Sequence, residues 1–456
     1  MKKYLNALFI VRSAEHFSRY RGIVHAWCMR GHAVTVLFDA EWSSEDDMKK
    51  VEEFKRSVSN FGYSLLVNRA DVWTRSLFIV RSLLTYRRFL VVKNQSSFFK
   101  DRWRRYLPFW LRLPLGLRFA DMVLETGVAN SLLTFCEKII PADKKITAQI
   151  KSYHPDVVIS PVGVIRVLSP NTEYLKAAKA LNIPAVSPLV SWDSLTTKSF
   201  ISVKPDFFLA WNEVHRTEAF EHHGIPAANT KIIGSPVFDK WFSPLAPSMS
   251  RAGFCRLLGF ERERPYVLYL GSAKGTAENE TWLIRALRKA FDESDDRALR
   301  DVWIVVRPHP AHAGIYKNFE IPGVSVFPKK GALPDTRESL QSSFDSYYYA
   351  TAVMGIFTSA MMEALIVGKP VIVILPKEYE KTQMEAQHFQ HFVAGGAATL
   401  ASNMGKVIDA VKKLLEGKDD LANKRKDFVQ NYLRPRGLNV SASEAAVDEI
   451  EKCVGR

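Results

Sequence analysis

The 456-residue chain has few cysteines and no long hydrophobic run. The four cysteines are widely separated and form no C-x-x-C pair: Cys28, Cys136, Cys255 and Cys453. This spacing argues against a zinc site and suits a reducing cytosol. No apolar stretch approaches the ~18 residues expected of a membrane-spanning helix. The apolar stretch after Lys3 stops at Arg12 without a cleavage site, so it predicts an opening β-strand and a cytoplasmic protein.

Several motifs that would fix the chemistry are also missing. The glycine-rich segment after "YVLYL" matches neither G-x-x-x-x-G-K-[ST] nor G-x-G-x-x-G, and no predicted strand-end loop carries D-x-D. Two H-x-x-H pairs, His309/His312 and His388/His391, supply fewer ligands than the three or four of a zinc site. We therefore expect neither a metal nor a bound cofactor, and we expect His388 to line a cleft or to pack locally.

Positive charge is concentrated in one segment. The formal net charge is +15, and eleven Lys or Arg residues stand against a single acid between Trp73 and Phe119. The cations alternate with aromatic residues, a pattern typical of helices that lie on an anionic membrane surface. The surface expected here consists of Arg102, Trp103, Arg104, Arg105 and Trp110. Helices packed on the sheet with solvated charges are the close alternative, and nucleic acid ranks last because no nucleic-acid-reading motif accompanies the segment.

Strands alternate with helices along the chain, which predicts two doubly wound Rossmann-like α/β domains that face an interdomain cleft. The N-terminal, acceptor-side domain spans 1–240 and carries the basic aromatic insertion at about 73–119. The Pro- and Ser-rich stretch "KWFSPLAPSMS" marks the boundary. A linker with one helix at 241–262 leads to the C-terminal, donor-side domain at 263–435, and 436–456 form a helical tail.

Two predicted strand ends of the second domain carry candidate ligand-binding residues, because open parallel sheets bind ligands beyond the carboxyl ends of their strands. Gly271, Ser272 and Lys274 follow the strand "YVLYL", although a plain glycine-rich turn explains them equally well. Arg307 and His309 stand in the loop R-P-H-P, whose prolines fix the direction of both side chains toward a phosphate or carboxylate. The alternative is an exposed strand end with an incidental ion pair.

A third strand end lies in "GIFTSAMMEALIVGKPVIVI". Thr358 and Ser359 open the helix, and Glu363 follows four residues after Ser359, one position beyond that of a capping box. Hydroxyls at a helix N-terminus suit diphosphate oxygens, and a carboxylate one turn later suits ribose hydroxyls. A capping hydroxyl with a dipole-favoured glutamate is the alternative. Taken together, the three strand ends predict a nucleotide diphosphate site.

The second domain resembles the donor-binding half of GT-B glycosyltransferases. The matching pieces, in family order, are "SRAGFCRLLGFERERPYVLYLGS", the R-P-H-P loop and "DSYYYATAVMGIFTSAMMEALIVGKPVIVI". The R-P-H-P loop and the T-S-x-x-x-E-A-x-x-x-G-K-P-V element are similar to those of bacterial surface-polysaccharide (capsule or lipopolysaccharide) transferases. Polyol-phosphate transferases and UDP-sugar 2-epimerases are relatives. The likeness covers Ser250 to about Pro376 well, and the first domain by architecture only.

This resemblance implies metal-independent transfer of a sugar from a nucleotide-sugar to a surface-polysaccharide or lipid-linked glycan acceptor. The protein would be peripheral on the inner face of the cell membrane. The implied roles are diphosphate binding for Thr358 and Ser359, ribose binding for Glu363, and phosphate or sugar binding for Arg307 or His309, with Lys274 in reserve. The alternatives are a UDP-sugar 2-epimerase, a polyol-phosphate transferase of the same fold, and a non-catalytic membrane-associated protein.

An inverting transferase also needs a base near the acceptor hydroxyl, and the strand-end loops of the first domain are the places to seek it. The candidates are Asp193, His16 and Glu213. Asp193 ranks first because Trp192 beside it can pack on a sugar face. The structural alternatives are a helix-start residue for His16, an N-cap for Asp193 and a dipole-compensating acid for Glu213. A retaining mechanism needs no such base.

Overall fold

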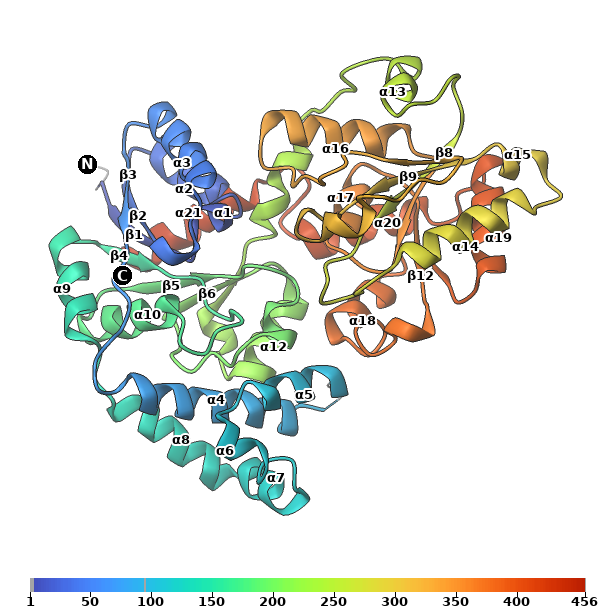
Figure 1. The fold of residues 1–456 in the computed structure, drawn as a ribbon. Coiled ribbons are helices and arrows are strands. Elements are labelled where there is room, and N and C mark those ends of the chain that lie inside the picture. Colours follow the sequence, from blue (N-terminus) through green and yellow to red (C-terminus); the bar gives the residue numbers. More distant parts are fainter. Residues whose placement is uncertain (1–3, 94–95, 456) are drawn as a thin grey trace. The chain divides into compact units, whose positions relative to one another are not determined.

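The computed structural model describes residues 4–93 and 96–455, and the chain forms two compact units. Unit 1 comprises Met1–Asp239 and Tyr432–Arg456, and unit 2 comprises Lys240–Asn431. Each unit contains one parallel β-sheet with helices around it (Figure 1). The predicted fold class, two doubly wound parallel α/β domains, is confirmed.

Unit 1 is built on seven parallel strands in the order β3-β2-β1-β4-β5-β6-β7. The strands are β1 (Asn6–Val11), β2 (Ala33–Phe38), β3 (Phe61–Leu65), β4 (Val157–Ile159), β5 (Ala185–Pro188), β6 (Phe207–Ala210) and β7 (Thr230–Ile232). Ala7 of β1 pairs with Val34 of β2 and with Val157 of β4. The central strands are almost continuously apolar because both faces of a doubly wound sheet are covered.

The last helix of the chain belongs to the core of unit 1. The Rossmann-type helices of this unit are α1 (Ala14–Phe17), α2 (Arg21–Met29), α3 (Glu45–Ser57), α9 (Lys144–Tyr153), α10 (Pro170–Ala180), α11 (Ser194–Thr197), α12 (Glu213–His223) and α21 (Ala442–Val454). Helix α21 packs on α2, and its Ala446, Val447 and Ile450 are buried in the same cluster as Phe9 of β1. The C-terminal segment therefore completes the first sheet's hydrophobic core.

Five helices between β3 and α9 form an addition to unit 1, here called the helical insert. They are α4 (Thr74–Val91), α5 (Ser97–Arg105), α6 (Phe109–Arg112), α7 (Arg118–Glu125) and α8 (Gly127–Ile139). Figure 1 shows α4 and α8 side by side, and the two helices are in contact. Leu107, Leu115, Leu124 and Tyr86 form a small core of their own. Within the described ranges, no helix has both the length and the apolar character needed to cross a bilayer.

Unit 2 is built on six parallel strands in the order β10-β9-β8-β11-β12-β13. The strands are β8 (Tyr266–Leu270), β9 (Trp303–Arg307), β10 (Val324–Val326), β11 (Ala352–Gly355), β12 (Val371–Ile374) and β13 (Thr399–Ala401). The strand order reverses between β8 and β11, where ligands of such sheets bind. A Cβ atom on Gly355 would lie 2.6 Å from the Leu270 carbonyl oxygen, so glycine permits the close approach of these two strands.

The helices of unit 2 follow its strands in the expected alternation. They are α13 (Arg251–Leu257), α14 (Thr281–Asp292), α15 (Arg297–Arg300), α16 (Arg337–Tyr349), α17 (Ala360–Ile366), α18 (Gln387–Ala394), α19 (Met404–Leu415) and α20 (Ala422–Phe428), with the 3-10 turns η4 (Pro310–Tyr316) and η5 (Lys377–Tyr379). Helix α16 leads into β11, and α17 connects β11 to β12. These two helices carry most of the side chains that surround the candidate site.

Candidate functional site

Loops at the carboxyl ends of adjacent strands in unit 2 are tied to one another. The backbone N–H of Gly271, after β8, donates to the carbonyl of Arg307 at the end of β9 over 2.9 Å. The amide Nε2 of Gln383 donates to the carbonyls of Ile356 (2.6 Å) and Ile374 (2.9 Å), and so links the ends of β11 and β12. The predicted strand ends at Gly271 and Arg307 are therefore direct neighbours. Gln383 is a contributor that the sequence analysis missed.

The loop after β8 passes close to the R-P-H-P loop. A Cβ atom on Gly271 would lie 3.2 Å from both the Pro308 Cα and the His309 N, so a larger residue would force the two loops apart. Lys274 lies exposed in the same loop. The structure thus gives Gly271 a packing role and leaves Lys274 accessible to a ligand.

Glu280 organises the loop after β8. It is fully buried, and its carboxylate accepts hydrogen bonds from the hydroxyls of Ser272 (3.0 Å), Tyr269 (2.9 Å) and Tyr316 (3.1 Å) and from the Ser272 N–H. Burial raises the pKa of Glu280, and these hydrogen bonds oppose the rise. Both hydrogen-bond donors of Ser272 are engaged by Glu280, so Ser272 stabilises the loop itself.

Arg307 lies inside unit 2, with 6% of its surface exposed. Its guanidinium donates to the hydroxyls of Ser343 (2.7 Å) and Ser346 (3.4 Å), both on α16. Burial lowers the pKa of Arg307, while the nearby Tyr347 and Glu363 raise it. The sequence analysis expected this side chain to contact a ligand, whereas the structure places it against α16 behind the strand end.

Glu363 lies on α17 and is partly buried. Its Oε2 atom accepts a hydrogen bond from the Tyr347 hydroxyl over 2.9 Å. Burial raises the pKa of Glu363, and the positive charge of Lys240, the Tyr347 hydrogen bond and the charge of Arg307 lower it. The ring of Trp241 packs on Tyr347, with the centroids 5.5 Å apart. Arg307 and Glu363, predicted on separate strand ends, thus belong to one cluster that is joined through Tyr347.

Thr358 and Ser359 lie directly before α17 but do not cap it with their side chains. Ser359 occupies the N-cap position without a side-chain hydrogen bond, and the carbonyls of Thr358 and Ser359 accept the N–H groups of Met361 and Met362 instead. Ser359 is exposed and Thr358 partly so. Neither hydroxyl bonds another residue in the part of the chain that the structure describes. The capping alternative is therefore excluded, and both hydroxyls are accessible to a ligand.

The histidines of unit 2 have local partners. His309 is the N-cap of η4, and its Nδ1 accepts the N–H of Ala311 over 3.2 Å, which places the proton of the neutral ring on Nε2. His388 is buried, with its ring 5.4 Å from that of Phe357, so it packs locally. Over residues 4–93 and 96–455, no group of three or more His, Cys, Asp or Glu side chains could hold a metal ion.

His16 follows β1 in unit 1 and lies beside a buried serine. Its Nδ1 is 2.7 Å from the hydroxyl of Ser13. Burial, followed by the charges of Arg19 and Arg12, lowers the pKa of His16 to about 4. The ring is therefore neutral at pH 7, and a pKa this low makes it a weak general base.

Asp193 and Glu213 follow β5 and β6 and both form ion pairs. The Oδ2 of Asp193 lies 2.8 Å from the Lys198 ammonium and accepts the Thr197 hydroxyl over 3.1 Å. Trp192 is buried, so the structure does not support the expectation that its ring packs on a sugar. Glu213 stands in the first turn of α12, is largely exposed and pairs with Arg216, as the structural alternative described. Asp193 remains the better candidate for a general base of these two acids, because its side chain is less exposed than that of Glu213.

The expected membrane surface is only partly on the surface. Trp103 is 2% exposed and donates its indole N–H to the carbonyl of Thr197 over 3.1 Å, so placing it on the surface was wrong. Arg102 also donates to that carbonyl over 2.5 Å. Arg104 is partly exposed, and Arg105 and Trp110 are exposed. Arg102 and Trp103 thus connect α5 to the end of α11, while Arg105 and Trp110 face solvent.

Comparisons with known proteins place the fold. No family model and no curated protein matches this sequence. The UDP-GlcNAc 2-epimerase of Neisseria meningitidis, solved with UDP-GlcNAc, is 13% identical over 99% of this chain and 100% of its own, with a TM-score of 0.55. The UDP-GlcNAc 2-epimerase of Methanocaldococcus jannaschii gives the same four values. A glycosyltransferase from Rickettsia africae ESF-5 is 11% identical over 100% of this chain and 99% of its own, with a TM-score of 0.56. The chain therefore shares the fold of GT-B glycosyltransferases and UDP-sugar epimerases.

Proposed function

We propose that the protein is a glycosyltransferase that moves a sugar from a nucleotide-sugar donor to a surface-polysaccharide or lipid-linked glycan acceptor at the inner face of the cell membrane. The observation that carries this proposal is the pair of accessible hydroxyls, Thr358 and Ser359, one turn before Glu363. Hydroxyls without protein partners beside an oriented carboxylate are suited to a ligand that has phosphate oxygens and ribose hydroxyls. Their position, at the carboxyl end of β11 where the strand order reverses, is where such ligands bind.

Each part of the nucleotide-sugar donor is assigned to side chains of matching charge or hydrogen-bonding character. Thr358 and Ser359 donate hydrogen bonds to the diphosphate, and Glu363, oriented by Tyr347, accepts hydrogen bonds from the ribose. Arg307 is engaged by two serines, so its role is to balance the charge of Glu363 from behind. Lys274, exposed after β8, neutralises the departing diphosphate, and this lowers the barrier to its release. His309 contacts the phosphates or the sugar through its Nε2–H group.

The acceptor side follows the chemistry of an inverting transfer. A carboxylate removes the proton of the acceptor hydroxyl as that oxygen bonds to the anomeric carbon, and the bond between this carbon and the diphosphate breaks. Asp193 is assigned as the base, because the Lys198 ammonium and the Thr197 hydroxyl fix the position of its carboxylate. The nucleoside diphosphate leaves with both electrons of the broken bond, and the chemistry requires no metal ion.

A UDP-sugar 2-epimerase is the second candidate function. It is favoured by the likeness to the Neisseria and Methanocaldococcus enzymes, which share the fold across nearly the whole chain. An epimerase inverts one carbon of the bound sugar and needs no acceptor. Incubation with UDP-sugars alone separates the two functions, because product that forms without an acceptor identifies the epimerase.

The donor site is tested by calorimetry with nucleoside diphosphates. Glu363→Ala should weaken the Kd by about 10–100-fold, the range of one hydrogen bond to a charged group. It should also lower the free energy of unfolding by about 1–3 kcal/mol, because the Tyr347 hydroxyl loses its acceptor. Glu261→Ala, which removes an exposed glutamate of the same unit, is the matched control and should leave the Kd unchanged. An unaltered Kd in Glu363→Ala would remove the ribose assignment.

A further inference from the structure

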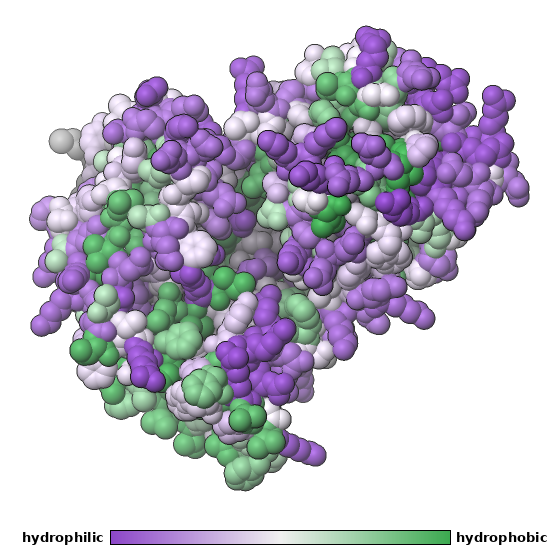
Figure 2. All heavy atoms as spheres, viewed as in Figure 1, coloured by the Kyte–Doolittle hydropathy of each residue, from purple (hydrophilic) through white to green (hydrophobic). Residues whose placement is uncertain are grey.

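The helical insert exposes an extended apolar face. Figure 2 shows hydrophobic side chains gathered over the part of the molecule where Figure 1 places α6 to α8. Six of these side chains define the apolar face: Phe109 (79% exposed), Leu113 (84%), Phe119 (78%), Val128 (79%), Leu132 (61%) and Phe135 (58%). No other described segment covers them. A soluble surface rarely leaves this much contiguous apolar area without a partner.

Helix α8 shows that this exposure follows a pattern. Val128, Leu132 and Phe135 recur at the spacing of one helix face and point to solvent. Another side of the same helix, about a third of a turn away, supplies Ala129 and Leu133 to the core of the insert. Apolar residues on both sides of a helix indicate that a second apolar environment covers the outer side.

The charges around the apolar face have one dominant sign. Among the residues described at 93 and from 96 to 139, the exposed acids are Asp101 and Glu125. The exposed cations are five: Lys93, Arg105, Arg112, Arg118 and Lys138. Each cation near an anionic bilayer contributes roughly 1 kcal/mol. The segment that carries the apolar face therefore exposes more positive than negative charge, which is complementary to anionic headgroups.

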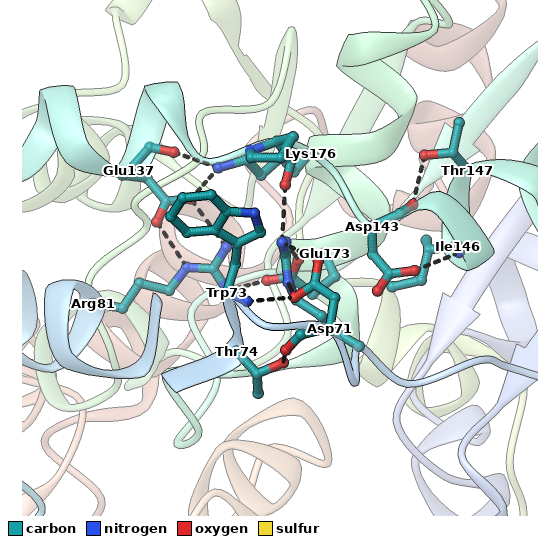
Figure 3. Close-up of polar contacts among 12 residues, drawn as sticks. Asp71, Trp73, Thr74, Arg81, Glu137, Asp143, Ile146, Thr147, Glu173 and Lys176 are labelled. Carbon is teal, nitrogen blue, oxygen red and sulfur yellow. Dashed lines mark hydrogen bonds and ion pairs between the residues drawn. The ribbon is translucent and has the colours of Figure 1, made fainter. Parts of the chain in front are cut away.

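The base of the insert is fixed to unit 1 by buried charges. Figure 3 shows Arg81 of α4 between Glu137 of α8 and Glu173 of α10, with Lys176 also bonded to Glu137. The guanidinium of Arg81 contacts the two oxygens of Glu137 over 3.1 and 3.0 Å. Helix α8, which carries half of the apolar face, is thus held in place before any partner binds, which reduces the entropic cost of docking.

We infer that this face of α6, α7 and α8 is a lipid-docking surface that lies in the headgroup region of an anionic bilayer. The aromatic and aliphatic side chains enter the boundary between headgroups and acyl chains, and the bordering Arg and Lys residues contact the headgroups. The surface differs from the predicted one, which included Arg102 and Trp103, because these two side chains donate to the carbonyl of Thr197 in α11. The inference identifies the membrane contact of the proposed function and stands whether or not the protein transfers a sugar.

The test is sedimentation of the full-length protein with vesicles of phosphatidylcholine alone or mixed in equal parts with phosphatidylglycerol. The wild type should pellet with the mixed vesicles, and less so as salt rises. The double variant L132S/F135S should lose at least tenfold in binding, and R112S/R118S should lose most of the salt-dependent part. The matched control is M29S/F220S, which removes two exposed apolar side chains of unit 1 outside the insert and should pellet like the wild type.

Four results would overturn the inference. The wild type would pellet with neither vesicle, or equally with both. L132S/F135S would pellet as well as the wild type, or M29S/F220S would lose as much binding as L132S/F135S. Self-association that L132S/F135S abolishes, without vesicle binding, would assign the face to a second copy of the chain. Folding is checked by thermal unfolding, which exposed substitutions should shift little. L132S/F135S should also keep the wild-type nucleotide Kd, so failure of the docking surface and failure of the donor site are distinguishable.

Discussion

The strand ends of the two units differ in how their polar side chains are satisfied. In unit 1, His16, Asp193 and Glu213 each have a hydrogen-bond or ion-pair partner within five positions of the chain. In unit 2, the hydroxyls of Thr358 and Ser359 bond no other described residue. Local partners explain a polar side chain without invoking a ligand, whereas accessible, unengaged hydroxyls require water or a ligand. The comparison therefore identifies unit 2 as the stronger candidate for the nucleotide site.

The largest expected effect is a loss of kcat at Asp193 in unit 1, without a change in the nucleotide affinity proposed for unit 2. Asp193→Asn should lower kcat by about 10²–10⁴, the usual contribution of a general base, because an amide cannot accept the acceptor's proton. The Kd for the nucleoside diphosphate should stay unchanged, since the proposed nucleotide site is in unit 2 and Asp193 is in unit 1. Steady-state kinetics and calorimetry measure the two quantities. Glu213→Gln, the same change at an exposed acid, is the control, and an equal loss of kcat there would contradict the assignment.

Next in size is the effect of removing the buried acceptor of unit 2. Glu280→Ala should lower the free energy of unfolding by about 3 kcal/mol or more, because Ser272, Tyr269 and Tyr316 lose their common acceptor. Urea unfolding measures the change. Glu278→Ala, at an exposed position two residues earlier, should stay within about 0.5 kcal/mol of the wild type. Equal stability of the two variants would show that the cluster does not hold the loop.

A smaller effect is expected at Ser359, where substitution distinguishes a ligand-binding hydroxyl from a helix-capping one. Ser359→Ala should weaken the nucleotide Kd by about tenfold, the value of one hydrogen bond to phosphate, without changing the urea midpoint. Ser250→Ala should do the reverse and cost about 1 kcal/mol of stability, because the Ser250 side chain accepts the N–H of Gly253 and caps α13. Calorimetry and urea unfolding on both variants make the comparison. A loss of stability in Ser359→Ala alone would restore the capping explanation.

The smallest expected effect is a pH dependence in unit 1. The pKa of His16 is lowered to about 4, so as pH falls below about 6.5 the unfolded chain takes up a proton before the folded protein does. The contribution of His16 to stability is therefore complete at neutral pH and is lost as pH falls toward 4. His16→Gln should remove this part, on the order of 1 kcal/mol between about pH 7 and about pH 5.5, from the pH dependence of the free energy of unfolding measured with urea. Identical pH profiles for the two proteins would contradict the shift.

The sequence predicted the sheets and the neighbouring strand ends, but not which side chains face inward. Alternating apolar strands and helices suffice for the fold, and parallel strands bring Gly271 and Arg307 together at one edge. The burial of Trp103 depends on the carbonyl of Thr197, 94 residues away, which no local pattern reveals. The role of Glu280 depends on three hydroxyls from different elements, and Glu278, two residues before it, is exposed.

The apolar spacing in α8 could have extended the predicted membrane-binding segment, but the segment was defined by counting charges. The basic segment was delimited at Phe119 by its arginines, whereas the apolar spacing of Val128, Leu132 and Phe135 continues beyond it. Helical periodicity predicts that such residues share one side, but only tertiary structure tells whether that side faces the core or solvent. Here both sides of α8 are apolar, and the core side was already occupied by Ala129 and Leu133.

The buried ion cluster makes the helical insert inseparable from its host domain. Arg81 forms ion pairs with the carboxylates of two residues. One is Glu137, 56 positions later in the insert, and the other is Glu173 of helix α10, outside the insert. Excising the insert would remove Arg81 and leave Glu173 with Arg69 as its cationic partner, and it would take Glu137 away from Lys176. Any shortened version of this protein would have to replace Lys176 with an uncharged side chain and keep Glu173 as the partner of Arg69.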